Sequence, residues 1–376
     1  MAFLAAITDA PPQLRPTATV VRSRTGEITV ERPGLCADVE AAVAAAGAAA
    51  VAAMTQARTT RTETRSGRLF SWTGNAWAAA AAGSAKCGSD PGGDFPRGTL
   101  LRVVSYNVWF AKHEWERRCD GLIELLFGQE EADLALLQEA TPRFLGRLLG
   151  DVRVRERFCI SDAGDGASFH GHYGVVMLVR RTLPLPQLTF VELVSQMGRR
   201  GLIAEFGCGL DRSSDSSQTL AITTVHLESL NRAETRLEQL KLLDRVLKCQ
   251  HHSLEVLAGD FNIPSSGALS NRSEHESVTQ MMDEAGWQDC FVRENGEHGA
   301  NAELGGGLTY DTRVNTMVRR VTGQEEDCAR YDRVLARKAP DASASVQNVR
   351  VIRGQLDEAL FISDHFGLAF EIWVPS

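Results

Sequence analysis

From residue 101 onward, short apolar runs alternate with amphipathic segments and clusters of turn residues. The β-branched and aromatic residues in the apolar runs predict strands over 101–106, 133–137, 173–180, 200–206, 219–226, 254–258, 331–336, 346–353 and 367–374. Apolar residues at helical spacing predict helices over 113–127, 232–248 and 274–284. Few of these strands are separated by a helix, so we expect two mainly antiparallel sheets packed face to face with helices outside. The pattern therefore predicts an α/β fold of the α+β type, a four-layer sandwich.

Residues 1–97 have a different pattern, rich in alanine and ending in a Gly/Pro-rich stretch. A hairpin over 19–30, a helix over 38–57 and a strand pair around 68–77 would make this region a small module. A partly disordered tail with local structure is the alternative. We expect a boundary near Gly98, with an N-terminal appendage of unknown role followed by a catalytic domain over 98–376 that folds without it.

Composition places the chain among globular proteins, with 43% hydrophobic and 23% charged residues. The formal net charge of -8 argues against a protein that coats nucleic acid through a large basic surface. It does not exclude an enzyme that gathers carboxylates around a divalent cation, because the cation reverses the local field where a phosphate binds.

Cysteine usage and hydropathy indicate the environment of the protein. The eight cysteines are scattered, with no Cys-x-x-Cys pair, which is typical of reduced thiols and argues against a structural zinc site. We therefore expect an intracellular, reducing compartment, the nucleus or the cytoplasm, with an organelle left open. The apolar start is short and lacks a basic lead, and no segment approaches about 18 apolar residues, so we expect no secretory signal and no membrane partner.

Polar side chains lie at or beside the ends of the predicted strands, where a sandwich can hold them at a common mouth. These residues are Asn107, Glu139, His226, Asp260, Asn262, Asp364 and His365. Taken singly, each has an ordinary structural explanation, such as an Asx-turn at Asp260. Together they supply an oxygen ligand for magnesium, a carboxylate base, an amide to orient it and two imidazoles for phosphate. The set predicts metal-dependent hydrolysis of a phosphodiester.

Six motifs, in order along residues 101–374, resemble those of the endonuclease/exonuclease/phosphatase superfamily. They are Ser105-Tyr106-Asn107-Val108-Trp109, Leu137-Gln138-Glu139, His226-Leu227-Glu228-Ser229, Gly259-Asp260-Phe261-Asn262, Tyr331-Asp332-Arg333-Val334 and Ser363-Asp364-His365. Within the superfamily the chain is most similar to the tyrosyl-DNA phosphodiesterase 2 branch. That narrower likeness rests on the His226 motif, on the helix that follows it and on the loop 308–315, where Tyr310 replaces the branch's tryptophan.

The resemblance implies a magnesium site in which Mn²⁺ can substitute. Glu139 would be the direct ligand, with Asn107 beside it and Asp364 as a further carboxylate. One departure bears on this site, because the superfamily usually has an Asp two residues after the Asn and this chain has Trp109. That departure predicts either a weaker metal affinity or a different subfamily.

The resemblance also implies the roles of the other polar residues. Asp260 would take a proton from the attacking water, and Asn262 would fix that water. His365, oriented by Asp332, and His226 would donate hydrogen bonds to the non-bridging phosphate oxygens as charge develops there.

The implied substrate is a DNA 5' end that carries a tyrosyl adduct, processed by a monomer in DNA repair. The residues expected to bind it are Ser229, Arg232, Arg236, Tyr310, Asp311 and Asn315. In this interpretation Tyr310 stacks on a terminal base while Arg232 and Arg236 contact phosphates. Abasic-site endonuclease, deadenylase, inositol phosphatase and sphingomyelinase activities share the catalytic motifs and stay open. A non-catalytic binding protein is the alternative from another class.

Overall fold

The computed structural model describes residues 19–22, 28–31, 64–80, 98–169, 171–207, 219–264, 272–296 and 307–375. The chain divides into two compact units, Met1–Thr62 and Glu63–Ser376. In the first unit, β1 (Thr19–Arg22) pairs antiparallel with β2 (Ile28–Glu31), as the expected hairpin requires. The helix expected over 38–57 lies outside the described residues.

The second unit contains two large sheets. One has seven strands in the order β14-β17-β13-β12-β11-β10-β3, with bounds Gln288–Asp289, Asp332–Lys338, Leu254–Asp260, Leu220–His226, Arg200–Phe206, Gln187–Glu192 and Thr64–Ser66. The other has eight strands in the order β18-β19-β6-β7-β9-β8-β4-β5, with bounds Ser345–Ile352, Gly367–Val374, Thr99–Asn107, Leu134–Ala140, Gly174–Arg180, Phe158–Ile160, Phe70–Trp72 and Trp77–Ala79. Each sheet has a single parallel pair, β12 with β13 and β6 with β7, and every other neighbouring pair is antiparallel.

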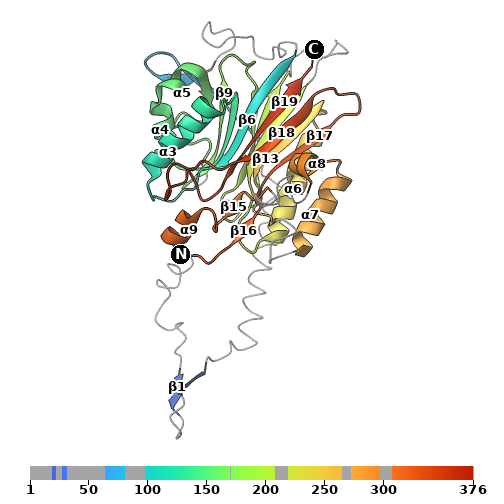
Figure 1. Cartoon of the computed structure of the whole chain (residues 1–376). Coiled ribbons are helices and arrows are strands. Elements are labelled where there is room, and N and C mark those ends of the chain that lie inside the picture. Colours follow the sequence, from blue (N-terminus) through green and yellow to red (C-terminus); the bar gives the residue numbers. More distant parts are fainter. Residues whose placement is uncertain are drawn as a thin grey trace. The chain divides into compact units, whose positions relative to one another are not determined.

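Helices cover the outer face of both sheets (Figure 1). On the eight-stranded sheet these are α3 (Trp115–Glu124), α4 (Pro142–Gly150) and α5 (Val152–Arg157), which bury a cluster that includes Leu122, Leu145 and Leu178. On the seven-stranded sheet they are α6 (Ala233–Lys248) and α7 (Arg272–Glu284), whose apolar faces meet strands β11 to β13. The largest cluster lies between the sheets and takes residues from both. The predicted four-layer sandwich is therefore confirmed.

Shorter elements complete the unit. They are η3 (Leu125–Gln129), α8 (Cys290–Asn295), α9 (Thr316–Thr322), and the small sheet of β15 (Tyr310–Asp311) and β16 (Cys328–Ala329). Helix α4, which the pattern did not predict, begins with local signals: the Thr141 hydroxyl accepts the Phe144 N–H, and Pro142 takes the first helical position.

The two parallel pairs bring four strand ends to one edge of the sandwich. Each pair is connected by a helical crossover, β6-α3-β7 and β12-α6-β13, so both strands end at the same side. The register places His226 opposite Asp260, and Asp260 opposite Asp332 on the antiparallel neighbour β17. Gly259 permits the close approach of β13 to β12, because a Cβ there would lie 2.1 Å from the Val225 carbonyl oxygen.

Strands β3, β4 and β5 belong to the second compact unit, although their sequence was expected to lie in the N-terminal appendage. The strand pair expected around 68–77 forms as β4 and β5, but β4 also pairs with β8, and β3 pairs with β10. Leu69, between them, is buried in the core between the sheets. The compact unit therefore begins at Glu63 and not near 98. The sequence did not predict this limit, because three-residue strands carry too little alternation to be assigned.

Among the described residues, Cys119, Cys249, Cys290 and Cys328 are free thiols. Within the same residues, every helix is too short or too polar to cross a membrane.

Candidate active site

Asp260 lies at the centre of the polar cluster that the strand ends create. It is the last residue of β13 and is 1% exposed. Its Oδ2 accepts a hydrogen bond of 2.9 Å from the Asn107 Nδ2, and its Oδ1 accepts one of 2.8 Å from the Asn262 N–H. The Asn262 Nδ2 donates a hydrogen bond of 3.1 Å to the Leu227 carbonyl oxygen. These two amides fix the orientation of the carboxylate.

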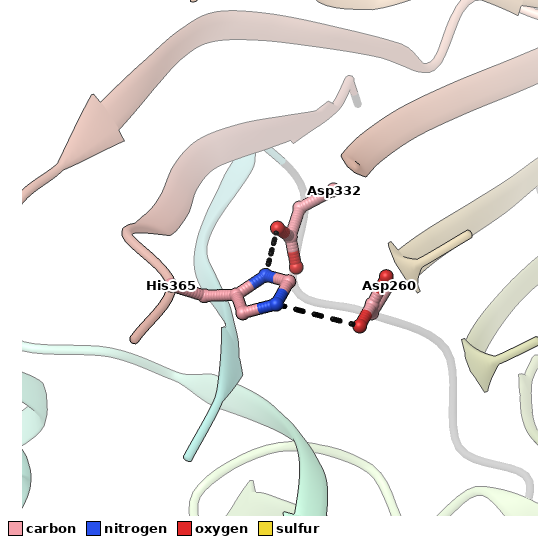
Figure 2. A group of neighbouring side chains, drawn as sticks. All are labelled: Asp260, Asp332 and His365. Carbon is pink, nitrogen blue, oxygen red and sulfur yellow. Dashed lines mark hydrogen bonds and ion pairs between the residues drawn. The ribbon is translucent and has the colours of Figure 1, made fainter. Parts of the chain in front are cut away.

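His365 lies between two carboxylates, as Figure 2 shows. Its Nδ1 donates to the Asp332 Oδ2 at 2.8 Å, and its Nε2 is 3.9 Å from the Asp260 Oδ2. Burial opposes the charged ring, but Asp332 and Asp260 outweigh it and raise the pKa of His365 well above its usual value. Asp332 is itself fixed by Thr309, whose hydroxyl oxygen accepts the Asp332 N–H at 3.0 Å. His365 is therefore an imidazolium, and its bond to Asp332 orients the ring.

His226 has the opposite charge state. Its Nδ1 lies 2.8 Å from the Arg199 Nη1, and a guanidinium can only donate, so Nδ1 must be the acceptor. The ring proton is then on Nε2, which lies 3.6 Å from the Glu139 Oε1 and 3.5 Å from the Asp260 Oδ2. Burial, Arg199 and His365 lower the pKa of His226 well below its usual value. The site thus combines one neutral imidazole with one charged imidazole.

Glu139 and Asp364 form an oxygen-rich corner of the site. The Glu139 Oε2 accepts a 3.0 Å hydrogen bond from the Phe110 N–H, and Asp364 accepts one of 3.0 Å from the Ser363 hydroxyl. Burial and the charge of Asp364 raise the pKa of Glu139 to about 7. Burial likewise raises the pKa of Asp364, which the nearby Asp260 reinforces. Two buried carboxyl groups with raised pKa values, one acting on the other through its charge, fit a divalent cation, which would neutralise both.

A second group of potential metal ligands comprises Asp260, Asp332 and His365, whose ligand atoms lie within 4.8 Å of one another. Within this group the His365 Nδ1 already donates a hydrogen bond to the Asp332 Oδ2. Both Asp260 oxygens also accept hydrogen bonds from amides. Magnesium prefers oxygen ligands, so Glu139 and Asp364 are the better site for it, and the group around His365 suits acid–base chemistry.

Trp109, at the position where the superfamily usually has an Asp, makes an apolar contact. It packs against Met317, Leu360 and Phe366 and is 7% exposed. Its indole lies 4.8 Å from the guanidinium carbon of Arg118, which is buried and donates to five backbone carbonyl groups, including that of Trp109. The corner beside Glu139 therefore has one carboxylate fewer and a buried cation nearby.

Two of the residues expected to bind substrate lie after His226 at the rim of the site. Ser229 accepts a hydrogen bond of 3.2 Å from the Arg199 Nη2, and Arg232 is exposed at the start of α6. Arg236, by contrast, is 2% exposed. It forms a bidentate ion pair with Glu274 at 2.6 and 2.8 Å and donates to the carbonyl groups of Glu228 and Leu230. The expectation that Arg236 contacts a phosphate is wrong, because its guanidinium is used inside the protein.

The loop 308–315 also differs from its expected role. Tyr310 is 7% exposed, its hydroxyl donates to Gln324, and its ring meets the His365 ring edge-on at 5.4 Å. It therefore packs beneath His365 and has no free face for a base. Asp311 is 5% exposed and is paired with Arg313. Asn315 is fully buried and donates to the Ser363 carbonyl group, so both residues fix the loops around His365.

Three residues at the site were not predicted from the sequence. Arg199 contacts His226, Tyr173 stacks near it with ring centroids 6.0 Å apart, and Phe110 stacks on Tyr173 at 5.0 Å with an interplanar angle of 14°. Phe110 is 51% exposed, so it provides the aromatic surface that was expected from Tyr310. A large apolar residue directly after a strand-end motif is the signal that could have indicated it.

Comparisons with known proteins agree with this geometry. The sequence profile of the endonuclease/exonuclease/phosphatase family matches residues 104–365, which confirms the resemblance seen in the motifs. The structure of D. rerio TDP2 (tyrosyl-DNA phosphodiesterase 2) complexed with single strand DNA product is 23% identical over 73% of this chain and 99% of its own, with a TM-score of 0.56. Truncated Caenorhabditis elegans TDP2 is 18% identical over 74% and 99%, with a TM-score of 0.53.

The human Nocturnin catalytic domain with bound sulfate anion is 16% identical over 73% of this chain and 95% of its own, with a TM-score of 0.50. Among curated proteins, none matches this chain. At these identities the solved structures establish the fold.

Proposed function

Because this chain belongs to the endonuclease/exonuclease/phosphatase family, we propose that it is a magnesium-dependent phosphodiesterase that cleaves 5'-phosphotyrosyl bonds at DNA ends. The observation that carries the hydrolytic part is the arrangement of Asp260 between a neutral His226 and a charged His365. Such a set provides a base, a neutral hydrogen-bond donor and a cationic donor within a few ångströms of one point.

Each residue of this set has a separate role in the proposed reaction. Asp260 accepts the proton of the attacking water, since its carboxylate lies near both imidazoles and both its oxygens are held by amides. The His226 Nε2–H and the His365 Nε2–H donate to the non-bridging oxygens, where negative charge increases in the transition state. Asp332 retains the charge on His365 through their 2.8 Å bond.

Glu139 and Asp364 would hold the divalent cation, with Asn107 beside them. When bound there, magnesium would act as a Lewis acid that stabilises developing charge on the leaving oxygen. Mn²⁺ has the same preference for oxygen ligands and should substitute for it.

The substrate class is the finer part of the proposal. Its support is the similarity to D. rerio TDP2, whose structure is described as complexed with a single strand DNA product. Phe110 adds an exposed aromatic face next to Glu139, suited to stack on a base or a phenol ring. Arg232 and Ser229 at the rim can contact flanking phosphates without reading sequence.

A panel of substrates tests the proposal. The purified full chain is incubated with magnesium and single-stranded DNA carrying a 5'-tyrosyl group, the 3'-tyrosyl counterpart, abasic duplex, poly-adenylate and sphingomyelin. We expect 5'-tyrosyl DNA to be cleaved fastest, with no cleavage after complete chelation. Equal rates on the two tyrosyl substrates, or preferred cleavage of another substrate, would assign the protein to another branch of the family. Absence of all cleavage with a metal-saturated protein would favour a binding protein.

A further inference from the structure

Glu228 is a buried carboxyl group outside the set of residues that would act on the phosphodiester. It is fully buried, and three donors converge on its side chain. These are the Ser195 hydroxyl at 2.5 Å, the Gln196 N–H at 3.0 Å and the Gln239 Nε2–H at 3.4 Å. Among the described residues, no cationic group lies within ion-pair distance of it, so these neutral donors must offset the cost of its burial.

Ser195 connects Glu228 to the loop before β11. Because the Ser195 hydroxyl donates to Glu228, its oxygen is left to accept, and it accepts the Met197 N–H at 3.0 Å and the Arg199 N–H at 2.9 Å. One hydroxyl group therefore fixes two backbone amides of this loop. The carboxyl group of Glu228 sets the direction of this hydroxyl group.

Arg199 lies at the end of that loop and is 5% exposed. Among the described residues it has no carboxylate partner within ion-pair distance, and its guanidinium donates to the neutral His226 Nδ1 and the Ser229 hydroxyl. The 2.8 Å contact with Nδ1 is what excludes a proton from that nitrogen. Without it, the ring of His226 could hold its proton on either nitrogen, and only one tautomer presents a donor to the mouth of the site.

We propose that Glu228 is a positioning residue: through Ser195 it fixes the loop that carries Arg199, and Arg199 keeps the proton of His226 on Nε2, facing the phosphate position. The catalytic consequence rests on the function proposed above, because that proton is useful only where a phosphate oxygen accepts it. The structural consequence, the tautomer of His226, does not depend on activity.

Two measurements on the full chain test this relay. The first is the ¹⁵N NMR spectrum of labelled histidine, with the His226 signals assigned by the variant His226→Gln. The second is kcat and KM for bis(p-nitrophenyl) phosphate. Glu228→Gln replaces one carboxyl oxygen with an NH₂ group, so one of the three donors to Glu228 loses its acceptor. Ser195→Ala removes the hydroxyl group that connects Glu228 to the loop, with less effect on packing. For both we expect loss of the single Nε2–H tautomer and a kcat about 10-fold lower, with KM changed by less than about 2-fold.

The control is Glu205→Gln, which makes the same substitution at another buried glutamate, near the far end of β11. It should leave the His226 spectrum and kcat as in the wild type, and Arg199→Lys should mix the tautomers. The proposal is overturned if Glu228→Gln and Ser195→Ala both retain the wild-type His226 spectrum. A wild-type chain that cleaves no phosphodiester would defeat the proposed function, while the NMR measurement would still decide the role of Glu228.

Discussion

Asp260 is the residue on which the proposed chemistry most depends, because its Oδ2 lies 3.5 Å from the His226 Nε2 and 3.9 Å from the His365 Nε2. Asp260→Asn keeps the size of the side chain and removes the base, so we expect kcat to fall at least about 100-fold with little change in KM. Steady-state kinetics on the preferred substrate would measure both constants. Asp120→Asn, an exposed position on α3, is the matched control and should behave as the wild type. Near wild-type turnover of Asp260→Asn at saturating metal would assign the base elsewhere.

Glu139 links metal binding to pH. Its pKa is raised from 4.5 to about 7 in the folded protein, so the native state retains this proton to a higher pH than the unfolded chain. Between those values the stability of the metal-free protein therefore falls as pH rises. Below about pH 7 a cation must displace the proton, whereas above it the carboxylate is ready to bind.

The expected result is a larger rise of Tm with saturating magnesium at about pH 8 than at about pH 6. Glu139→Gln should lose this difference and, without metal, should be more stable than the wild type at the higher pH, because it buries no charge there. Thermal unfolding followed by circular dichroism measures these shifts. A magnesium effect on Tm that is the same at both pH values, or that persists in Glu139→Gln, would place the metal at another group.

At the scale of elements, the four strand ends that meet at the site share a backbone feature. The chain turns through a left-handed residue that is not glycine at Trp109 after β6, Glu139 in β7, Leu230 after β12 and Asn262 after β13. Such residues are uncommon and concentrate at functional sites. In β7 this conformation coincides with a register shift between Leu137 and Ala140, which turns the Glu139 side chain out of the strand alternation.

These strand ends explain which part of the site was predictable. The residues placed by regular strands, such as Asn107, His226 and Asp260, were identified because alternation fixes where a strand ends. Arg199 and Phe110 were not, because their positions depend on loop conformations: each follows a residue with positive φ, Gly198 before Arg199 and Trp109 before Phe110. The role of Arg236 was predicted wrongly for a related reason. Helical spacing indicates on which face of α6 a residue lies, but it does not indicate an ion-pair partner distant in sequence, here Glu274.

The loop after β6 carries Phe110, whose exposed ring can be tested by substitution. Phe110→Ala removes the exposed aromatic face but keeps the backbone N–H that donates to Glu139. We expect KM for a single-stranded DNA substrate to rise about 5-fold or more, as for loss of one stacking contact, with kcat within about 2-fold. Phe110→Tyr should retain the wild-type KM, and Val152→Ala, at a remote exposed apolar position, serves as the control. An unchanged KM in Phe110→Ala would show that the substrate does not meet this face.

At the scale of the whole molecule, the sandwich was predictable and its N-terminal limit was not. Long strands such as β6 and β19 supply most of the core between the sheets, and their apolar patterns are clear in the sequence. The β4–β5 hairpin contributes through contacts that only the fold creates. The guanidinium of Arg155 lies 4.3 Å from the Trp72 ring, and the Trp77 indole N–H donates to the Leu149 carbonyl group.

Two truncated chains test where the catalytic unit begins. A chain that starts at Glu63 keeps β3, β4 and β5, and we expect it to have the Tm and kcat of the second compact unit in the full chain. A chain that starts at Gly98 loses Leu69 from the core and exposes the edges of β8 and β10. Unpaired edges favour association, so this shorter chain should unfold more than about 5 °C lower and should aggregate. Thermal unfolding and size-exclusion chromatography of both chains measure the difference, and equal stability would show that the sandwich is complete without these strands.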